Sequence, residues 1–208
     1  GNNLKNLLRN NDSVKLSIQK TVQTASGYTI VPGTFYINDI VVRNNNGSSE
    51  LYAAVGLSGN RDTASTLFGG EDYGLYKSTD GGENWKKLEV YIDNSSKPIQ
   101  PIDLEISPSD NTIWVSSTRD FSGNGGGGIW QSDESGENFS KKYQVDQEFD
   151  PGRTEIEVTT NNTVWIYSST RDSSPVKIYK GTNGLTGPPT LIDLPIAVDI
   201  NGDFTRSQ

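Results

Sequence analysis

The sequence has no cysteine, histidine or methionine among its 208 residues. The lack of cysteine excludes disulfides and thiolate metal sites, and the lack of histidine removes imidazole ligands and the commonest general base. No apolar run approaches the ~20 residues that a membrane-spanning helix needs. Lysine and arginine number 18 against 26 acidic residues, for a net charge of −8. This balance disfavours a nucleic acid partner, because phosphate binding needs clustered basic residues.

The residues that are present favour a folded β protein. Apolar residues make up only 32% of the chain, but 4 Trp, 9 Tyr and 6 Phe supply large groups to bury, which argues against disorder. Short apolar stretches are separated by Gly, Asn, Asp and Ser, the residues that form turns. We therefore expect an all-β fold.

The chain repeats from residue 38 onwards with a period of about 50 residues. Trp114 and Trp165 are separated by one such period, as are Ser78 and Ser132. Each period contains four strand-like stretches, which is typical of a β-propeller blade. The predicted strands are 38–42, 51–55, 74–76 and 85–90 in the first unit, 102–106, 113–117, 128–130 and 139–145 in the second, and 154–158, 164–168, 177–179 and 190–194 in the third.

This repeat divides the chain into a lead-in and successive blades. Three blades cannot close a ring, because propellers need roughly four to eight. The sequence therefore predicts a segment of a larger propeller of about six to eight blades. The predicted divisions are a lead-in at 1–37 with a short helix and a strand of a preceding blade, blades at 38–92, 102–147 and 153–195, and the start of a further blade at 196–208.

A polar, Gly-rich turn joins the third and fourth strands of the first unit. It runs Ser-Thr-Asp-Gly-Gly-Glu-Asn-Trp over residues 78–85, and an altered copy follows at 132–139. Glycines permit tight turns, a short carboxylate can accept main-chain N–H groups, and a Trp ring can be buried between sheets. A third copy, around 181–184, has diverged further.

This turn resembles the Asp-box, or BNR repeat, of sialidase-like and sortilin-like propellers. The resemblance implies a structural role for the turn residues, on the periphery and opposite the usual ligand face. In the second copy Glu134 stands in place of Asp and Phe139 in place of Trp. The motif positions are occupied by Ser78, Asp80, Gly82 and Trp85 in the first copy and by Ser132, Glu134, Gly136 and Phe139 in the second.

A second resemblance concerns localisation. The runs at 112–120 and 203–206 are similar to parts of Asp-box proteins exported by the type IX secretion route of Gram-negative bacteria. This resemblance implies an extracellular or cell-surface protein.

Two repeated sets of charged residues are candidates for a ligand face. Arg61, Arg119 and Arg171 follow the second strands, on the face where propellers bind ligands, and Arg can hold a carboxylate at two points. An Asp follows each Arg, so the repetition favours a local ion pair instead. The second set, Asp39, Asp103 and Glu155 on the first strands, offers carboxylates for glycosidase chemistry, although its recurrence also favours a structural role.

Two further motifs are weak. Asp199, Asn201 and Asp203 alternate as calcium ligands do, but Phe204 stands where such a loop needs Gly. No other cofactor is indicated. The Gly run 123–128 lacks the Lys and Ser/Thr of a phosphate loop and precedes a strand, so it predicts an ordinary loop.

The sequence favours a non-catalytic module that binds or scaffolds glycans or proteins, with further propeller blades as its neighbours. One alternative is a glycoside hydrolase, sialidase-like or another exo-glycosidase, whose catalytic residues lie mostly outside this segment. The Arg-Ile-Pro sequence typical of sialidases is absent, which disfavours sialidase activity in this segment. Another alternative is a sortilin-like propeller that binds peptides.

Overall fold

The computed structural model describes residues 35–57, 73–120, 123–170 and 175–194, together with short strands at 19–24, 27–32, 197–198 and 204–205. These residues form three four-stranded antiparallel sheets and two small hairpins, β1 (Gln19–Thr24) with β2 (Gly27–Pro32) and β15 (Ala197–Val198) with β16 (Phe204–Thr205). They contain one 3-10 turn, Gln147–Phe149, and no α-helix. The predicted all-β class is confirmed, whereas the helix and strand expected within 1–18 lie outside the described residues.

Each large sheet is built from four strands that follow one another in the chain and pair in that order. The predicted unit of four strands is confirmed, although β6 is shorter than expected. Sheet 1 contains β3 (Phe35–Asn45), β4 (Ser48–Leu57), β5 (Gly74–Ser78) and β6 (Lys86–Lys87); sheet 2 contains β7 (Gln100–Ile106), β8 (Ile113–Thr118), β9 (Gly128–Ser132) and β10 (Phe139–Gln144); sheet 3 contains β11 (Pro151–Val158), β12 (Val164–Thr170), β13 (Val176–Gly181) and β14 (Thr190–Ile192).

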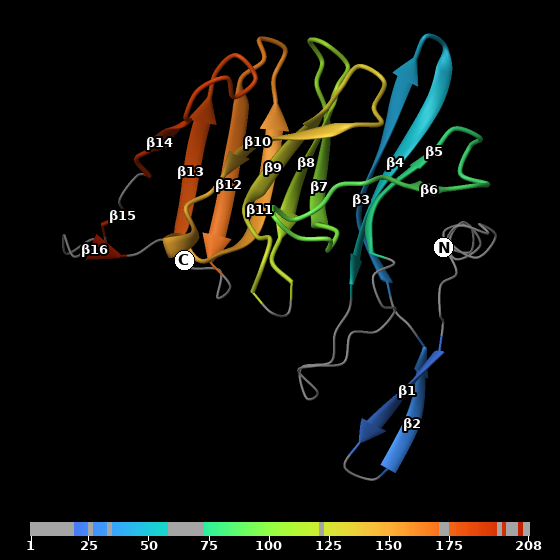
Figure 1. Ribbon diagram of the computed structural model, residues 1–208. Helices are drawn as coiled ribbons and strands as arrows, with labels where there is room; N and C mark the ends of the chain where they lie inside the picture. Colours follow the sequence, from blue (N-terminus) through green and yellow to red (C-terminus); the bar gives the residue numbers. More distant parts are fainter. Residues whose placement is uncertain are drawn as a thin grey trace.

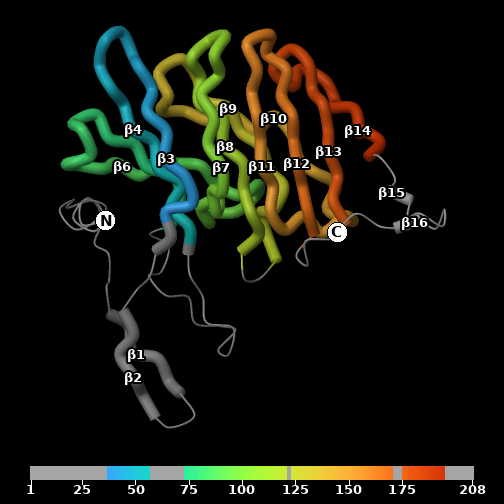
Figure 2. The backbone as a smooth tube through the Cα atoms, turned by 180° about the vertical axis from the view of Figure 1, so that it is seen from behind, coloured from blue at the N-terminus to red at the C-terminus, as the bar shows by residue number. Residues whose placement is uncertain are grey.

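The three sheets stand side by side in chain order, with their first strands β3, β7 and β11 adjacent (Figures 1 and 2). Each first strand carries a bulge near its start, where the register to its neighbour shifts by one residue. A bulge bends the strand and increases its twist, which suits neighbouring sheets that are turned relative to one another.

Burial along the second strands shows which sheet faces are covered. In β8, the residues from Ile113 to Ser117 are all buried, as expected for a strand whose two faces are both packed. In β12, burial alternates, with Val164 and Ile166 buried and Trp165 and Tyr167 exposed. Sheet 2 therefore lies between two packed layers, whereas sheet 3 has one covered face and one open face.

Two apolar cores join the sheets. Leu75 of sheet 1 packs with Val115 and Trp130 of sheet 2, and Trp114 on the other face of sheet 2 packs with Ile166 of sheet 3. A third cluster, which contains Trp85, lies on the opposite face of sheet 1. Burial of large side chains contributes about 1.5–3 kcal/mol each, so these cores supply the main attraction between sheets.

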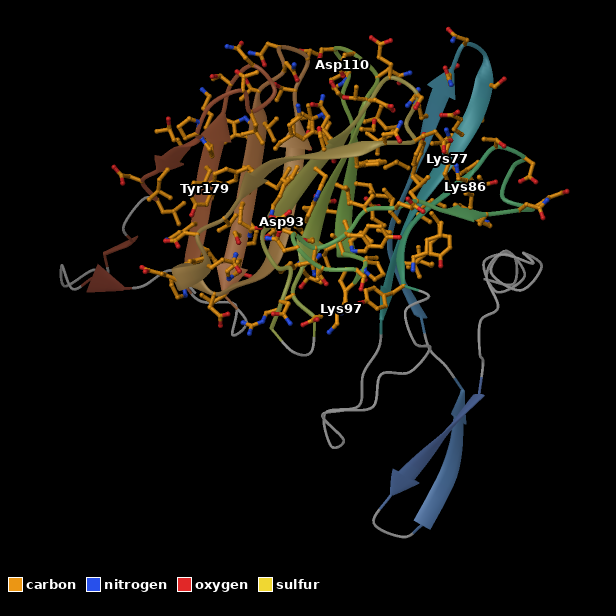
Figure 3. All side chains as sticks on the ribbon, viewed as in Figure 1. Lys77, Lys86, Asp93, Lys97, Asp110 and Tyr179 are labelled. Atoms are coloured by element: carbon orange, nitrogen blue, oxygen red, sulfur yellow. The ribbon has the colours of Figure 1, made fainter. Side chains whose placement is uncertain are left out.

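The β3–β4 and β7–β8 turns lie at the edge opposite the connections between the sheets, whereas the β8–β9 loop shares the edge of those connections (Figure 1). The β3–β4 hairpin closes with Asn46 and Gly47, both at positive φ, the pattern that a two-residue hairpin turn requires. Figure 3 shows Asp110, from the β7–β8 turn, at the upper edge and Lys97, from the connection between sheets 1 and 2, at the lower edge. Residues for a ligand site can therefore come from either edge.

Candidate functional site

The first polar turn, residues 78–85, satisfies its own hydrogen bonds. Ser78 Oγ accepts from the main-chain N–H of Gly82 at 2.9 Å and donates to Asp80 Oδ1 at 2.8 Å. Asp80 also accepts from the main chain and the side chain of Asn84, at 2.9 and 2.6 Å. These bonds, with that of the Asn84 main chain the strongest, lower the pKa of Asp80 to about 2. The indole N–H of Trp85, a buried residue, donates to Gly82 O at 3.0 Å.

The second polar turn, residues 132–139, uses a different carboxylate from the one the sequence suggests. Asp133, not Glu134, accepts from Ser135 Oγ at 2.6 Å and from the Asn138 side chain at 2.7 Å. These two bonds hold the pKa of Asp133 far below its ordinary value. Glu134 contributes only its main-chain carbonyl, which accepts from Arg43. Asp133 also accepts from the main-chain N–H groups of Glu137 and Asn138, so it takes the place that Asp80 has in the first turn.

The remaining residues of the second and third turns keep part of the pattern. Ser132 Oγ accepts from the main-chain N–H of Ile113 at 2.8 Å, and Phe139 is partly buried against the core between sheets 1 and 2. In the third turn, Asn183, Gly184 and Leu185 have positive φ. The third turn thus keeps the tight backbone of the motif.

A buried charge cluster docks the second polar turn onto sheet 1. Lys77 Nζ contacts Glu50 Oε1 at 3.0 Å and Glu137 Oε1 at 2.9 Å, and it donates to Ser135 O at 3.1 Å. The side chains of Lys77 and Glu50 are 5% and 9% exposed. Burial lowers the pKa of Lys77, but its hydrogen bonds to these carboxylates and to Tyr52 outweigh burial and raise the pKa above its ordinary value. The cluster is a structural ion-pair network.

The first-strand carboxylates join each sheet to the next. Asp39 Oδ2 accepts from the main-chain N–H of Leu104 at 2.9 Å, and Asp103 Oδ2 accepts from that of Ile156 at 2.7 Å. Burial raises the pKa of Asp103 to about 6, a rise that the bond from Ile156 opposes and the charges of Asp39 and Glu155 increase. Two of the three carboxylates that could have served catalysis are thus engaged in holding the sheets together.

Glu155 holds the equivalent position in sheet 3. It pairs in register with Tyr167, as Asp103 pairs with Ser116 and as Asp39 pairs with Ala54. In the structure Glu155 forms an ion pair with Arg153 instead of accepting a main-chain N–H.

Arg119 is the member of the arginine set that the structure describes; Arg61 and Arg171 lie outside the described residues. Its partner is Asp150, from the connection between sheets 2 and 3, and not the neighbouring Asp120. Asp120 accepts instead from the main-chain N–H of Asn124 at 2.8 Å. The expected local ion pair is therefore replaced by one that ties the β8–β9 loop to the next connection.

A pocket of about 290 Å³ opens at the same edge as Arg119. Its wall is built from three segments, namely the connection after β6, the Gly-rich β8–β9 loop and the end of β10. Residues from these segments include Ile92, Asp93, Asn124, Lys141, Gln144 and Gln147, and Trp130 of β9 also lines it. Asp93 is labelled in Figure 3. The sequence analysis did not predict this pocket. The Gly run 123–128, which supplies part of its wall, was the one feature of the sequence that marked the place.

The Gly run forms a closely packed loop, as its contacts show. Gly125 has φ +78, and a Cβ there would lie 2.7 Å from Ile92 Cδ1; at Gly126 it would lie 2.3 Å from Pro151 O. Gly127 N donates to Ser117 O at 3.0 Å. Glycine is required because neighbouring segments approach the main chain too closely for any side chain.

The described residues include no group of three or more His, Cys, Asp or Glu side chains placed to hold a metal ion. The candidate calcium ligands Asp199, Asn201 and Asp203 lie outside the part of the chain that the structure describes, as does Arg206 of the run 203–206. None of the helices in that part is long and apolar enough to cross a membrane.

The fold and the site together define an all-β protein made of repeated four-stranded antiparallel sheets. No protein-family model and no curated protein matches the sequence. Among solved structures, the chain is similar to an unknown function protein from Dyadobacter fermentans, with a TM-score of 0.50 and 16% sequence identity. The similarity covers 75% of this chain and 52% of that one, so this chain spans about half the length of its structural neighbour. At this identity the similarity concerns the fold alone.

Proposed function

We propose that sheets 1, 2 and 3 are consecutive blades of a larger Asp-box β-propeller. The bonds from Leu104 and Ile156 to the preceding first-strand carboxylates support this, because the same link recurs between each pair of neighbouring sheets. A repeated link of this kind favours the same rotation from sheet to sheet, and a constant rotation without translation along the axis closes a ring of blades.

The open face of sheet 3 supports the same proposal. Trp114 on the corresponding face of sheet 2 is fully buried under sheet 3, whereas Trp165 is 36% and Tyr167 is 38% exposed. Large apolar groups gathered on one face usually mark a surface that is covered in the assembled protein. In this proposal a further blade covers this face, and Glu155 leaves Arg153 to accept a main-chain N–H from it.

The function proposed for this propeller is a non-catalytic extracellular or cell-surface module that binds glycans or proteins. The observation that carries it is the use of Asp39 and Asp103 as acceptors of main-chain N–H groups of the next sheet, because this structural role accounts for the recurrence of the carboxylates without a catalytic one. The edge pocket supplies a place for a ligand. Export by the type IX route rests on the sequence resemblance.

A paired assay tests this function. The purified protein is applied to a glycan array and, in parallel, incubated with fluorogenic glycosides. We expect binding to a defined set of glycans, or to a protein partner captured from the same cell surface, with no release of fluorophore. Turnover that is abolished by Asp103→Asn would overturn the non-catalytic assignment.

One observation favours the hydrolase alternative. Burial raises the pKa of Glu105 to about 7, with the charges of Glu157, Asp103 and Asp39 adding to the rise. A carboxyl that titrates near neutrality is suited to a general acid. If this alternative holds, Glu105→Gln abolishes glycoside turnover and leaves glycan binding intact.

A further inference from the structure

The edge pocket presents fixed hydrogen-bond acceptors. The side-chain amides of Gln144 and Gln147 donate to the same two carbonyls: Gln144 Nε2 reaches Gly126 O at 2.8 Å and Val145 O at 3.2 Å, and Gln147 Nε2 reaches them at 3.3 and 2.9 Å. Among the described residues neither Oε1 atom receives a hydrogen bond. Gln144 and Gln147 both line the pocket, so its wall contains two side-chain amides that are held in place by main-chain carbonyls and that can still accept hydrogen bonds.

The charges of the pocket cancel. Lys141 Nζ forms an ion pair with Asp93 Oδ2 and lies 5.3 Å from the centroid of the Trp130 ring. This pair places one cation and one anion side by side, so an ionic ligand gains little from either. Asn124 also lines the pocket and is exposed, and its side chain makes no hydrogen bond to the described residues.

The pocket also has an apolar side. Ile92, which is partly buried, supplies this side, while Trp130 is only 4% exposed and lies beneath Lys141. Apolar surface and hydrogen-bonding groups therefore occur within one small volume. A volume near 290 Å³ lies at the lower end of the range for small-molecule sites. It suits one ring-sized ligand instead of an extended peptide.

From these features we infer that the edge pocket binds a single neutral sugar residue of a glycan. The ring hydroxyls exchange hydrogen bonds with the Gln144 and Gln147 amides, with Asn124 and with the Lys141–Asp93 pair, while the less polar side of the ring lies against Ile92. This inference rests on the proposed glycan-binding function and specifies its site and ligand class. The site lies at the outer edge between sheets 1 and 2, away from the first-strand carboxylates.

The test uses NMR titration of the isotope-labelled protein with glucose, galactose, mannose and N-acetylglucosamine, each as a separate probe at millimolar concentration. At least one sugar is expected to shift the side-chain NH₂ signals of Gln144 and Gln147, and the Trp130 indole signal with them. Lys141→Met should weaken that binding about tenfold, because it removes a donor and leaves Asp93 without its partner. Lys142→Met, a change of the next residue on the same strand, should leave the affinity unchanged.

Three outcomes would overturn the inference, and they differ in what they say of the proposed function. If sugars or array glycans bind but the shifts fall outside the pocket, or Lys141→Met binds as well as the parent, the pocket assignment fails and the binding function stands. If glucuronate binds more tightly than glucose and its affinity falls with salt, the pocket takes an anion and the neutral class is wrong. If no glycan binds in either assay, the sugar site fails with the glycan-binding function.

Discussion

The substitution Gly136→Ala tests how the second polar turn docks on sheet 1. Gly136 has φ +69, and a Cβ there would lie 2.0 Å from Tyr52 Oη and 2.5 Å from Arg43 Nη1. Both neighbours are buried, at 0% and 2% exposure, so neither can move without disturbing the interface. We expect about 1 kcal/mol of strain from the left-handed backbone and about 1–3 kcal/mol from displacing packed side chains, or about 2–4 kcal/mol together.

Gly81→Ala is the matched control. Gly81 also has positive φ, +76, but nothing lies within 4 Å of the Cβ position. It should therefore lose only the backbone contribution, about 1 kcal/mol. Urea unfolding of both variants, followed by tryptophan fluorescence, gives the two free energies of unfolding. Equal destabilisation of the two variants would refute the docking of this turn against Tyr52 and Arg43.

Three other predictions follow from the site. Asp133→Ala should destabilise the second polar turn by about 1 kcal/mol, whereas Glu134→Ala should leave the free energy of unfolding unchanged; thermal unfolding distinguishes them, and the reverse order would contradict the geometry. Lys77→Met should cost about 3 kcal/mol, because it leaves the buried carboxylate of Glu50 with only the longer contact to Arg43 Nε, at 3.5 Å. A double-mutant cycle with Glu137→Gln, which leaves the Arg43–Glu50 pair intact, should show that the two losses are not additive. The pKa of Asp103 is raised from 3.8 to about 6, so the stability it confers is complete below about pH 4 and is lost as the pH rises through 6. Asp103→Asn keeps an oxygen acceptor but cannot titrate. Between about pH 4.5 and 7.5 the free energy of unfolding of this variant should therefore fall by about 1–2 kcal/mol less than that of the parent, a figure that allows for solvent screening of the partly exposed carboxyl. Parallel pH profiles of the two proteins would contradict this.

Local patterns in the sequence predicted the strands of the three large sheets, but not the β1–β2 hairpin. Alternating and continuous apolar stretches located β3, β8 and β12, and the spacing of Trp114 and Trp165 gave the repeat, because these signals depend on neighbouring residues alone. The first polar turn also followed from its sequence, since its hydrogen bonds stay within residues 78–85. Trp85 is buried, as we expected for the aromatic ring of this turn.

Contacts between distant segments could not be predicted in the same way. The partner of Arg119 is Asp150 and not Asp120, because the loops of neighbouring sheets come together only in the folded chain. Likewise, Asp39 meets Leu104 across a sheet boundary. The edge pocket draws on three segments, and no local pattern indicates that these will share a wall.

Hydrogen exchange at two amides tests most directly whether first-strand carboxylates link successive sheets. In Asp39→Ala the Leu104 amide should exchange faster while the Ile156 amide is unchanged, and in Asp103→Ala the reverse should hold, because each amide donates to one of these carboxylates. Exchange that is unaltered at both amides, or raised equally at both in either variant, would contradict the repeated link and with it the propeller arrangement.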